Sequence, residues 1–109
     1  MQQYTLKNDG SRNIRFTGEL IAAAESSPDT AHPSFSRSVG RWTELNLYRT
    51  KGGKFVCEEI GYTQWEGEHT RHRVAVCDDQ ECVIEFFGTG WLAKKLYEDG
   101  EIDCAIEVE

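Results

Sequence analysis

The sequence predicts an α+β fold, in which a mainly antiparallel twisted sheet of about five strands carries two short helices from the C-terminal half on one face. Three observations predict this fold. Apolar and polar residues alternate with period two in several stretches of residues 1–77. A glycine turn at residues 51–54 joins two of these stretches, and after residue 78 the apolar spacing becomes helical. We expect residues 1–109 to form a single domain, because their number suits one hydrophobic core.

A hairpin over residues 41–62 is the element around which the other strands are expected to assemble. In its first strand, Leu45 and Leu47 alternate with polar and aromatic residues and should face the core. Gly52 and Gly53 permit a tight reversal, because neither has a Cβ atom that opposes positive φ. The return strand alternates less cleanly, so the sequence leaves open which of its faces is buried.

Four further strands are predicted on either side of this hairpin. Residues 3–7 form a short edge strand, an Asp-Gly turn follows, and residues 13–21 continue as a second strand. Residues 69–77 alternate after the hairpin, and residues 102–108 alternate at the C-terminal end. The alanine run that follows residue 21 favours a helix over a strand, so we expect the second strand to end there.

Two short helices are predicted between the last two strands. Asp78 and Glu81 have the spacing of a capping box, so a helix should begin near Asp79. A glycine-containing break ends it, and residues 91–99 form a second helix, for which Gly100 is the expected C-terminal stop.

Residues 25–40 are predicted to be a mobile surface loop. They contain both prolines of the chain and five serines, which interrupt helices and strands alike. A loop of this length can also contact a partner. Phe35 is its best candidate for docking on another surface.

The charge distribution is the most informative feature for function. The formal net charge is −7, and residues 78–109 carry ten acidic and two basic side chains. The preceding residues 1–77 carry ten basic and nine acidic side chains, so the excess negative charge lies in the C-terminal third. Such a surface attracts basic partners and repels nucleic acid at long range.

The N-terminal residues have no apolar segment and no cleavage site of a secretory signal, and no apolar run has the length of a membrane helix. We therefore expect a cytoplasmic protein that uses no membrane. Cys57, Cys77, Cys82 and Cys104 are expected to be reduced there.

The residues that commonly carry chemistry predict neither a metal site nor catalysis. Zinc accepts the side chains of His69, His72, Cys77 and Cys82, but in one strand the two histidines point to opposite faces, and His69 lies roughly 26 Å from Cys77. Cys82 is a poor nucleophile, because the acidic residues around it oppose its thiolate. No phosphate-binding or hydrolase motif is present. We expect no cofactor, no metal and no enzymatic activity.

Two segments carry a resemblance. The pattern FTGELIAAAESS followed by RWTELNLYRTKGGKFV and a Gly-Tyr-Thr turn resembles a set of small bacterial proteins over about half of the chain, and this resemblance implies no activity. In size and charge alone, the chain is similar to phage and plasmid inhibitors of defence systems, some of which mimic nucleic acid.

Two functions of different classes follow from these observations. The first is a non-enzymatic interaction protein that binds a basic surface of a partner protein and does not bind nucleic acid directly. The sequence leaves undecided whether the chain forms a homodimer through its terminal strand. The carboxylates expected to contact the partner are Asp78, Asp79, Glu81, Glu85, Glu98, Asp99, Glu101 and Asp103.

The second function is a small-molecule or anion-binding domain, conceivably an enzyme, that uses aromatic and basic residues around the 41–62 hairpin. Its expected ligand-binding residues are Trp42, Tyr48, Trp65, Arg71 and Arg73. Lys51, Lys54 and His72 would add to a basic patch there.

Overall fold

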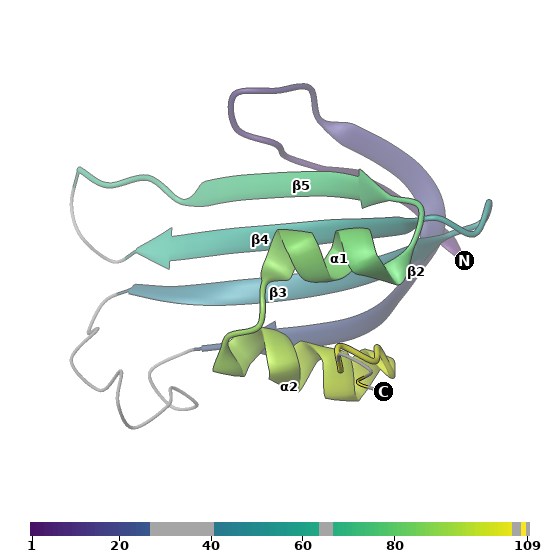
Figure 1. The fold of residues 1–109 in the computed structure, drawn as a ribbon. Helices are drawn as coiled ribbons and strands as arrows, with labels where there is room; N and C mark the ends of the chain where they lie inside the picture. The colour runs from purple at the N-terminus through teal and green to yellow at the C-terminus, as the bar shows by residue number, and fades with distance from the viewer. Residues whose placement is uncertain (27–40, 64–66, 106–107, 109) are drawn as a thin grey trace.

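A computed structural model describes residues 1–26, 41–63, 67–105 and 108, and it confirms the α+β class with an antiparallel sheet and two helices packed on it (Figure 1). The sheet has five strands in the order β1-β2-β3-β4-β5, so each strand pairs with its neighbour in sequence. The elements are β1 (Gln2–Leu6), β2 (Ile14–Glu25), β3 (Arg41–Thr50), β4 (Phe55–Thr63), β5 (Arg71–Cys77), α1 (Gln80–Phe87) and α2 (Trp91–Gly100).

The central hairpin is confirmed in strands and turn. β3 and β4 pair in unbroken register from Arg41 opposite Thr63 to Arg49 opposite Phe55. Gly53 has a φ of 88°, which supplies the left-handed conformation that the reversal requires. Both faces of β4 are buried, which answers the question that its irregular alternation left open.

β2 is longer than predicted and contains the alanine run as strand. Its pairing with β3 is shifted between Leu20 and Ala22, and a bulge of this kind bends a strand and increases its twist. Gly18 permits a close approach of the bent strand to β3, since a Cβ atom there would overlap the carbonyl oxygen of Arg49. The sheet therefore curls into a half-barrel.

The turn between β1 and β2 seals the outer edge of β5 and holds the half-barrel in its curled form. The backbone N–H of Asp9 donates to the carbonyl oxygen of His72 at 2.9 Å, and the N–H of His72 donates to Oδ2 of Asp9 at 2.8 Å. The N–H of Val74 donates to Oδ1 of Asn8 at 3.2 Å. The predicted Asp-Gly turn is confirmed, and it has this second role.

The curled sheet has a separate apolar cluster on each face. On the outer face the helices cover a cluster that includes Ala22, Ala24, Leu45, Leu47, Phe55, Cys57, Cys77, Val83, Ala93, Leu96, Tyr97 and Ile102. Inside the half-barrel lies a smaller cluster of Leu6, Tyr48, Val56 and Val74, against which Tyr4, Ile14 and Phe16 pack. Leu45 and Leu47 face the core as predicted.

The start of α1 is confirmed near Asp79, but the capping differs from the prediction. Oδ1 of Asp79 accepts the backbone N–H of Cys82 at 2.9 Å, so Asp79 is the N-cap residue. The predicted pair, Asp78 with Glu81, does not form the cap, because Asp78 turns toward Lys54 at 3.2 Å.

The end of α2 also differs from the prediction. Gly100 belongs to the helix, and Glu101 adopts the left-handed conformation at φ 57° that was expected of the glycine. A Cβ atom on Gly100 would lie 2.9 Å from the Cβ of Ala22. Close packing of α2 on β2 therefore explains the glycine.

The predicted C-terminal strand is wrong for the described residues 102–105 and 108, none of which is in a strand. Ile102 is buried in the helix-side cluster, and its N–H donates to the carbonyl oxygen of Tyr97. The alternation thus reflects a segment that packs on the core with one side. Among the described residues, neither helix has the length and apolar character needed to cross a bilayer.

Candidate functional site

Most of the predicted partner-binding carboxylates lie at one end of the molecule. α1 and α2 run in opposite directions, so the start of α1 and the end of α2 lie at the same end, near the turn between β3 and β4 (Figure 1). We call this surface the acidic end. It comprises Asp78, Asp79, Glu81, Glu98, Asp99, Glu101 and Asp103, all exposed, and Glu85 is exposed further along α1.

Four residues of the acidic end have local hydrogen-bond or ion-pair partners. Asp78 pairs with Lys54, and both side chains are largely exposed, at 82% and 59%, so water screens this pair strongly. Asp79 caps α1. Oδ2 of Asp99 accepts the N–H of Ala23 at 3.2 Å, and Oδ1 of Asp103 accepts the N–H of Ala105 at 3.0 Å. These bonds use one oxygen of each carboxylate and leave its charge at the surface.

The charges at the end of α2 oppose the helix dipole. In α2, which the structure describes in full, the last turn contains no basic side chain, although the negative end of the dipole favours one there. Glu98 and Asp99 occupy that turn instead, and Lys94 and Lys95 lie one turn earlier. Local helix stability does not explain this placement.

The ligand-binding set of the alternative hypothesis is divided between the two faces of the sheet. Trp42 stacks on Tyr62 at 5.3 Å, and Tyr48 belongs to the cluster inside the half-barrel. Arg73 lies on the outer face, where its Nε donates to Glu59 at 3.2 Å and its guanidinium lies 4.1 Å from the ring centre of Phe86.

Two residues complete that set. Arg71 pairs with Gly61 in the sheet and shares the outer face with Arg73, whereas Trp65 lies outside the described residues, as does Phe35. The described aromatic and basic members therefore do not line one pocket.

The predicted basic patch around the hairpin also does not form. Gly61 pairs with Arg71, so Lys54, which directly precedes β4, lies about seven residues, or roughly 23 Å, along the strand direction from Arg71. A hollow of about 520 Å³ lies near Arg71, but its lining is mixed in charge: Asp9, Thr43, Glu59, Gly61, Arg71, His72 and Arg73. Arg73 and Glu59 pair with each other there, which leaves little net charge to attract an anion.

A polar network inside the half-barrel was missed by the sequence analysis. Nδ2 of Asn46 donates to Oε1 of Glu44 at 3.1 Å and to Oε1 of Glu58 at 3.0 Å. The hydroxyl of Tyr48 donates to Glu58 at 3.2 Å, and the hydroxyl of Tyr62 donates to Glu44 at 2.7 Å. Asn46 and Glu58 are only 6% and 5% exposed. The one signal for this network was the aromatic residues that share the polar face of the hairpin.

The pKa values of the two tyrosines reflect this network. Burial and the nearby Glu58 carboxylate raise the pKa of Tyr48 far above its ordinary value. The hydrogen bond to Glu44, together with burial, raises the pKa of Tyr62 to about 12. Both phenols therefore stay protonated donors over the physiological pH range.

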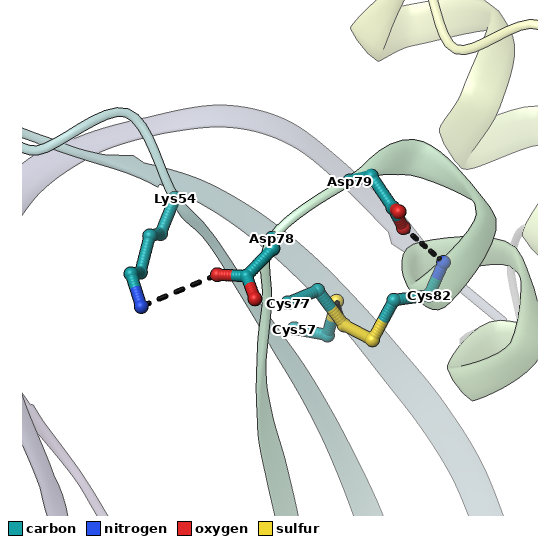
Figure 2. The surroundings of a disulfide bond; sticks show 6 residues. All are labelled: Lys54, Cys57, Cys77, Asp78, Asp79 and Cys82. Atoms are coloured by element: carbon teal, nitrogen blue, oxygen red, sulfur yellow. Dashed lines mark hydrogen bonds and ion pairs between the residues drawn. A yellow bond between two sulfur atoms is a disulfide. The ribbon is translucent and has the colours of Figure 1, made fainter.

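The expectation that all four cysteines are reduced is wrong for two of them. Cys77 and Cys82 form a disulfide between the end of β5 and the first turn of α1, with their Cα atoms 5.5 Å apart (Figure 2). Cys57 and Cys104 are free. Among the described residues, no three His, Cys, Asp or Glu side chains are placed to hold a metal ion.

Comparison of the chain with protein-family models, curated proteins and solved structures finds no match. The resemblance to small bacterial proteins stays an expectation, and any assignment of function depends on the geometry of the chain itself.

Proposed function

We propose that the protein is a small, non-enzymatic interaction protein whose acidic end binds a basic surface of a partner protein. The observation that carries the proposal is the gathering of exposed carboxylates where α1 begins and α2 ends, including Glu98 and Asp99 in a helix turn that disfavours them. Proteins often break a local rule of stability at positions that serve function.

The electrostatics of the acidic end suit a basic partner. Its carboxylates are concentrated around the start of α1 and the end of α2, and the described cation paired with one of them, Lys54, is itself largely exposed. A field of one sign steers an oppositely charged surface toward it and raises the rate of association. A partner that normally binds nucleic acid through a basic surface would bind the acidic end with that same surface. While the two proteins are bound, nucleic acid would be excluded from it.

The ligand-binding hypothesis receives less support from the geometry. Its aromatic residues Trp42 and Tyr48 and its basic residues Arg71 and Arg73 are on opposite faces of the sheet. A dimer through the terminal strand is likewise unsupported, because the described residues 102–105 are not in a strand.

The test is a pair of variants that change net charge equally at different places. Glu98→Gln with Glu101→Gln neutralises two acidic-end carboxylates for which the structure gives no hydrogen bond or ion pair, and Thr70→Lys with Thr89→Lys adds the same charge at exposed positions of the opposite end, where β5 begins and α1 has ended. Binding to an immobilised oligolysine peptide is measured at about 0.1 M and 1 M salt, over which the Debye length falls from about 10 Å to about 3 Å.

We expect the acidic-end variant to bind roughly tenfold more weakly at low salt, and the variant with lysines at positions 70 and 89 to bind nearly as the wild type does. High salt should remove the difference. Equal weakening by both variants would mean that net charge alone drives binding, and the acidic end would then not be a docking site.

A further inference from the structure

The disulfide lies within the acidic end, and only one of its two cysteines is exposed to solvent. Figure 2 shows Cys77 and Cys82 between Asp78, which pairs with Lys54, and Asp79, which caps α1. Cys77 is 1% exposed, whereas Cys82 is partly exposed. A thiol in solution therefore reaches the disulfide at Cys82.

A third cysteine lies against the buried half of the disulfide. The Cys57 thiol, on β4, donates a weak hydrogen bond to Sγ of Cys77 at 4.0 Å (Figure 2). Cys57 is 0% exposed, and burial raises the pKa of its thiol to about 12. At neutral pH this group stays protonated, so it serves as a donor and does not compete as a nucleophile.

We propose that the Cys77–Cys82 disulfide is a thiol-exchange site, which a neutral or cationic thiol enters at Cys82 and in which Cys57 stabilises the departing Cys77 thiolate. This inference does not depend on whether a partner protein binds the acidic end.

The exchange proceeds in two balanced steps. In the first, a thiolate attacks Sγ of Cys82, a mixed disulfide forms, the bond between the two cysteines breaks, and its electron pair goes to Sγ of Cys77. In the second, another thiolate attacks the reagent sulfur of the mixed disulfide and releases Cys82 as a thiolate. The two cysteines are reduced and the thiol reagent is oxidised to its own disulfide.

The charges around Cys82 select among thiols. Asp78, Asp79 and Glu81 are exposed within a few residues of it, and Lys54 pairs with Asp78, so acidic side chains outnumber this cation next to Cys82. An anionic thiol such as glutathione must approach against this field, while a thiol that carries an ammonium group is attracted by it. The site therefore takes neutral or cationic thiols in preference to anionic ones.

The selectivity is tested on the full oxidised chain with cysteamine, 2-mercaptoethanol and glutathione, each at the same thiolate concentration. We expect cysteamine to react roughly tenfold faster than glutathione at about 0.1 M salt, with 2-mercaptoethanol between them, and the three rates to converge at about 1 M. Reduction is followed by trapping and mass analysis of the released thiols. Equal rates at low salt, or reduction only after unfolding, would overturn the proposal.

The path through Cys82 and the role of Cys57 are tested in the same assay. Peptide mapping of acid-quenched samples should find the mixed disulfide on Cys82, and finding it on Cys77 would contradict the proposed path. Cys57→Ala should slow the first step several-fold, because the leaving thiolate loses its donor, and Cys57→Ser, which keeps a donor, should react at least as fast as the wild type. Cys104→Ser serves as the matched control on the other free cysteine.

Circular dichroism decides which Cys57 variant is informative. If Cys57→Ala loses native structure, the comparison rests on Cys57→Ser, whose hydroxyl is a stronger donor, and whose rate should equal or exceed that of the wild type. A folded Cys57→Ala variant that reacts at the wild-type rate would remove Cys57 from the mechanism.

Discussion

The two faces of strands β3 and β4 are buried to a similar depth, but their side chains differ in chemistry. Under the helices, Leu47 and Cys57 are both 0% exposed, and apolar residues surround them. Inside the half-barrel, Asn46 and Glu58 are 6% and 5% exposed, and tyrosine hydroxyls and a second carboxylate surround them. The first face is stabilised by transfer of apolar surface from water, and the second depends on every polar group finding a partner.

The largest expected effect comes from the apolar face. Leu47→Ala removes a fully buried side chain beneath the helices and leaves a cavity, so it should lower the free energy of unfolding by about 3 to 4 kcal/mol. Denaturant unfolding measures this change. A loss below about 1 kcal/mol would mean that the helices collapse onto the vacated space, and the two faces would then differ less than the packing implies.

On the polar face, the free energy of unfolding should depend more on hydrogen-bond acceptors than on side-chain volume. Glu58→Ala leaves the donors of Asn46 and Tyr48 without their acceptor and should cost about 2 kcal/mol. Glu58→Gln keeps the shape and one acceptor oxygen, and it should cost about 1 kcal/mol or less. The same denaturant experiment compares them. If Glu58→Gln is as damaging as Glu58→Ala, the negative charge, rather than the acceptor, is what the network requires.

The smallest expected effect is a pH dependence at the open end of the network. Hydrogen bonding to Glu44 raises the pKa of Tyr62 from 10.0 to about 12. Because the folded pKa is raised, Tyr62 stabilises the fold fully below pH 10 and loses this contribution as the pH rises toward 12.

Tyr62→Phe should therefore be less stable than the wild type by about 1 kcal/mol near pH 8, and this difference should shrink near pH 11. Denaturant unfolding of both proteins at the two pH values measures it. A difference that is unchanged or larger at the higher pH would exclude the Glu44 hydrogen bond as its source.

The apolar face of the hairpin could be predicted from the sequence alone. Leu45 and Leu47 alternate with polar neighbours, and the glycine turn after them fixes the hairpin, so strands, turn and core direction could be predicted from neighbouring residues. The polar face could not be predicted in this way. Asn46 and Glu58 have the pattern of a solvated face, and they are buried because a bulge near Leu20 and a distant turn curl the sheet around them.

The helices show the same division between local and distant causes. The start of α1 near Asp79 and the break at Gly88 follow from nearby residues and were predicted, although the cap was assigned to the pair Asp78 and Glu81. Gly100 was assigned to the wrong role, because its contact with Ala22 depends on packing between segments far apart in the chain. That contact also explains Ala22, where a larger side chain would hold α2 away from β2.

The candidate site was predictable in composition but not in arrangement. The acidic residues after position 78 could be counted in the sequence, while their gathering at one end depends on the antiparallel course of α1 and α2. The Cys77–Cys82 bond depends on the chain turning sharply from a strand into a helix, which brings the two Cα atoms to 5.5 Å.

The hydrogen bonds that Asn8 and Asp9 make to β5 have a consequence for self-association. A strand at the border of a sheet ordinarily exposes amide groups on which a strand from another molecule can add, and repeated addition leads to fibrils. Here the N–H groups of His72 and Val74 are already occupied by side chains of a turn that has no strand geometry of its own. At these two positions the β5 border of the sheet therefore has no free amide group on which another strand could add.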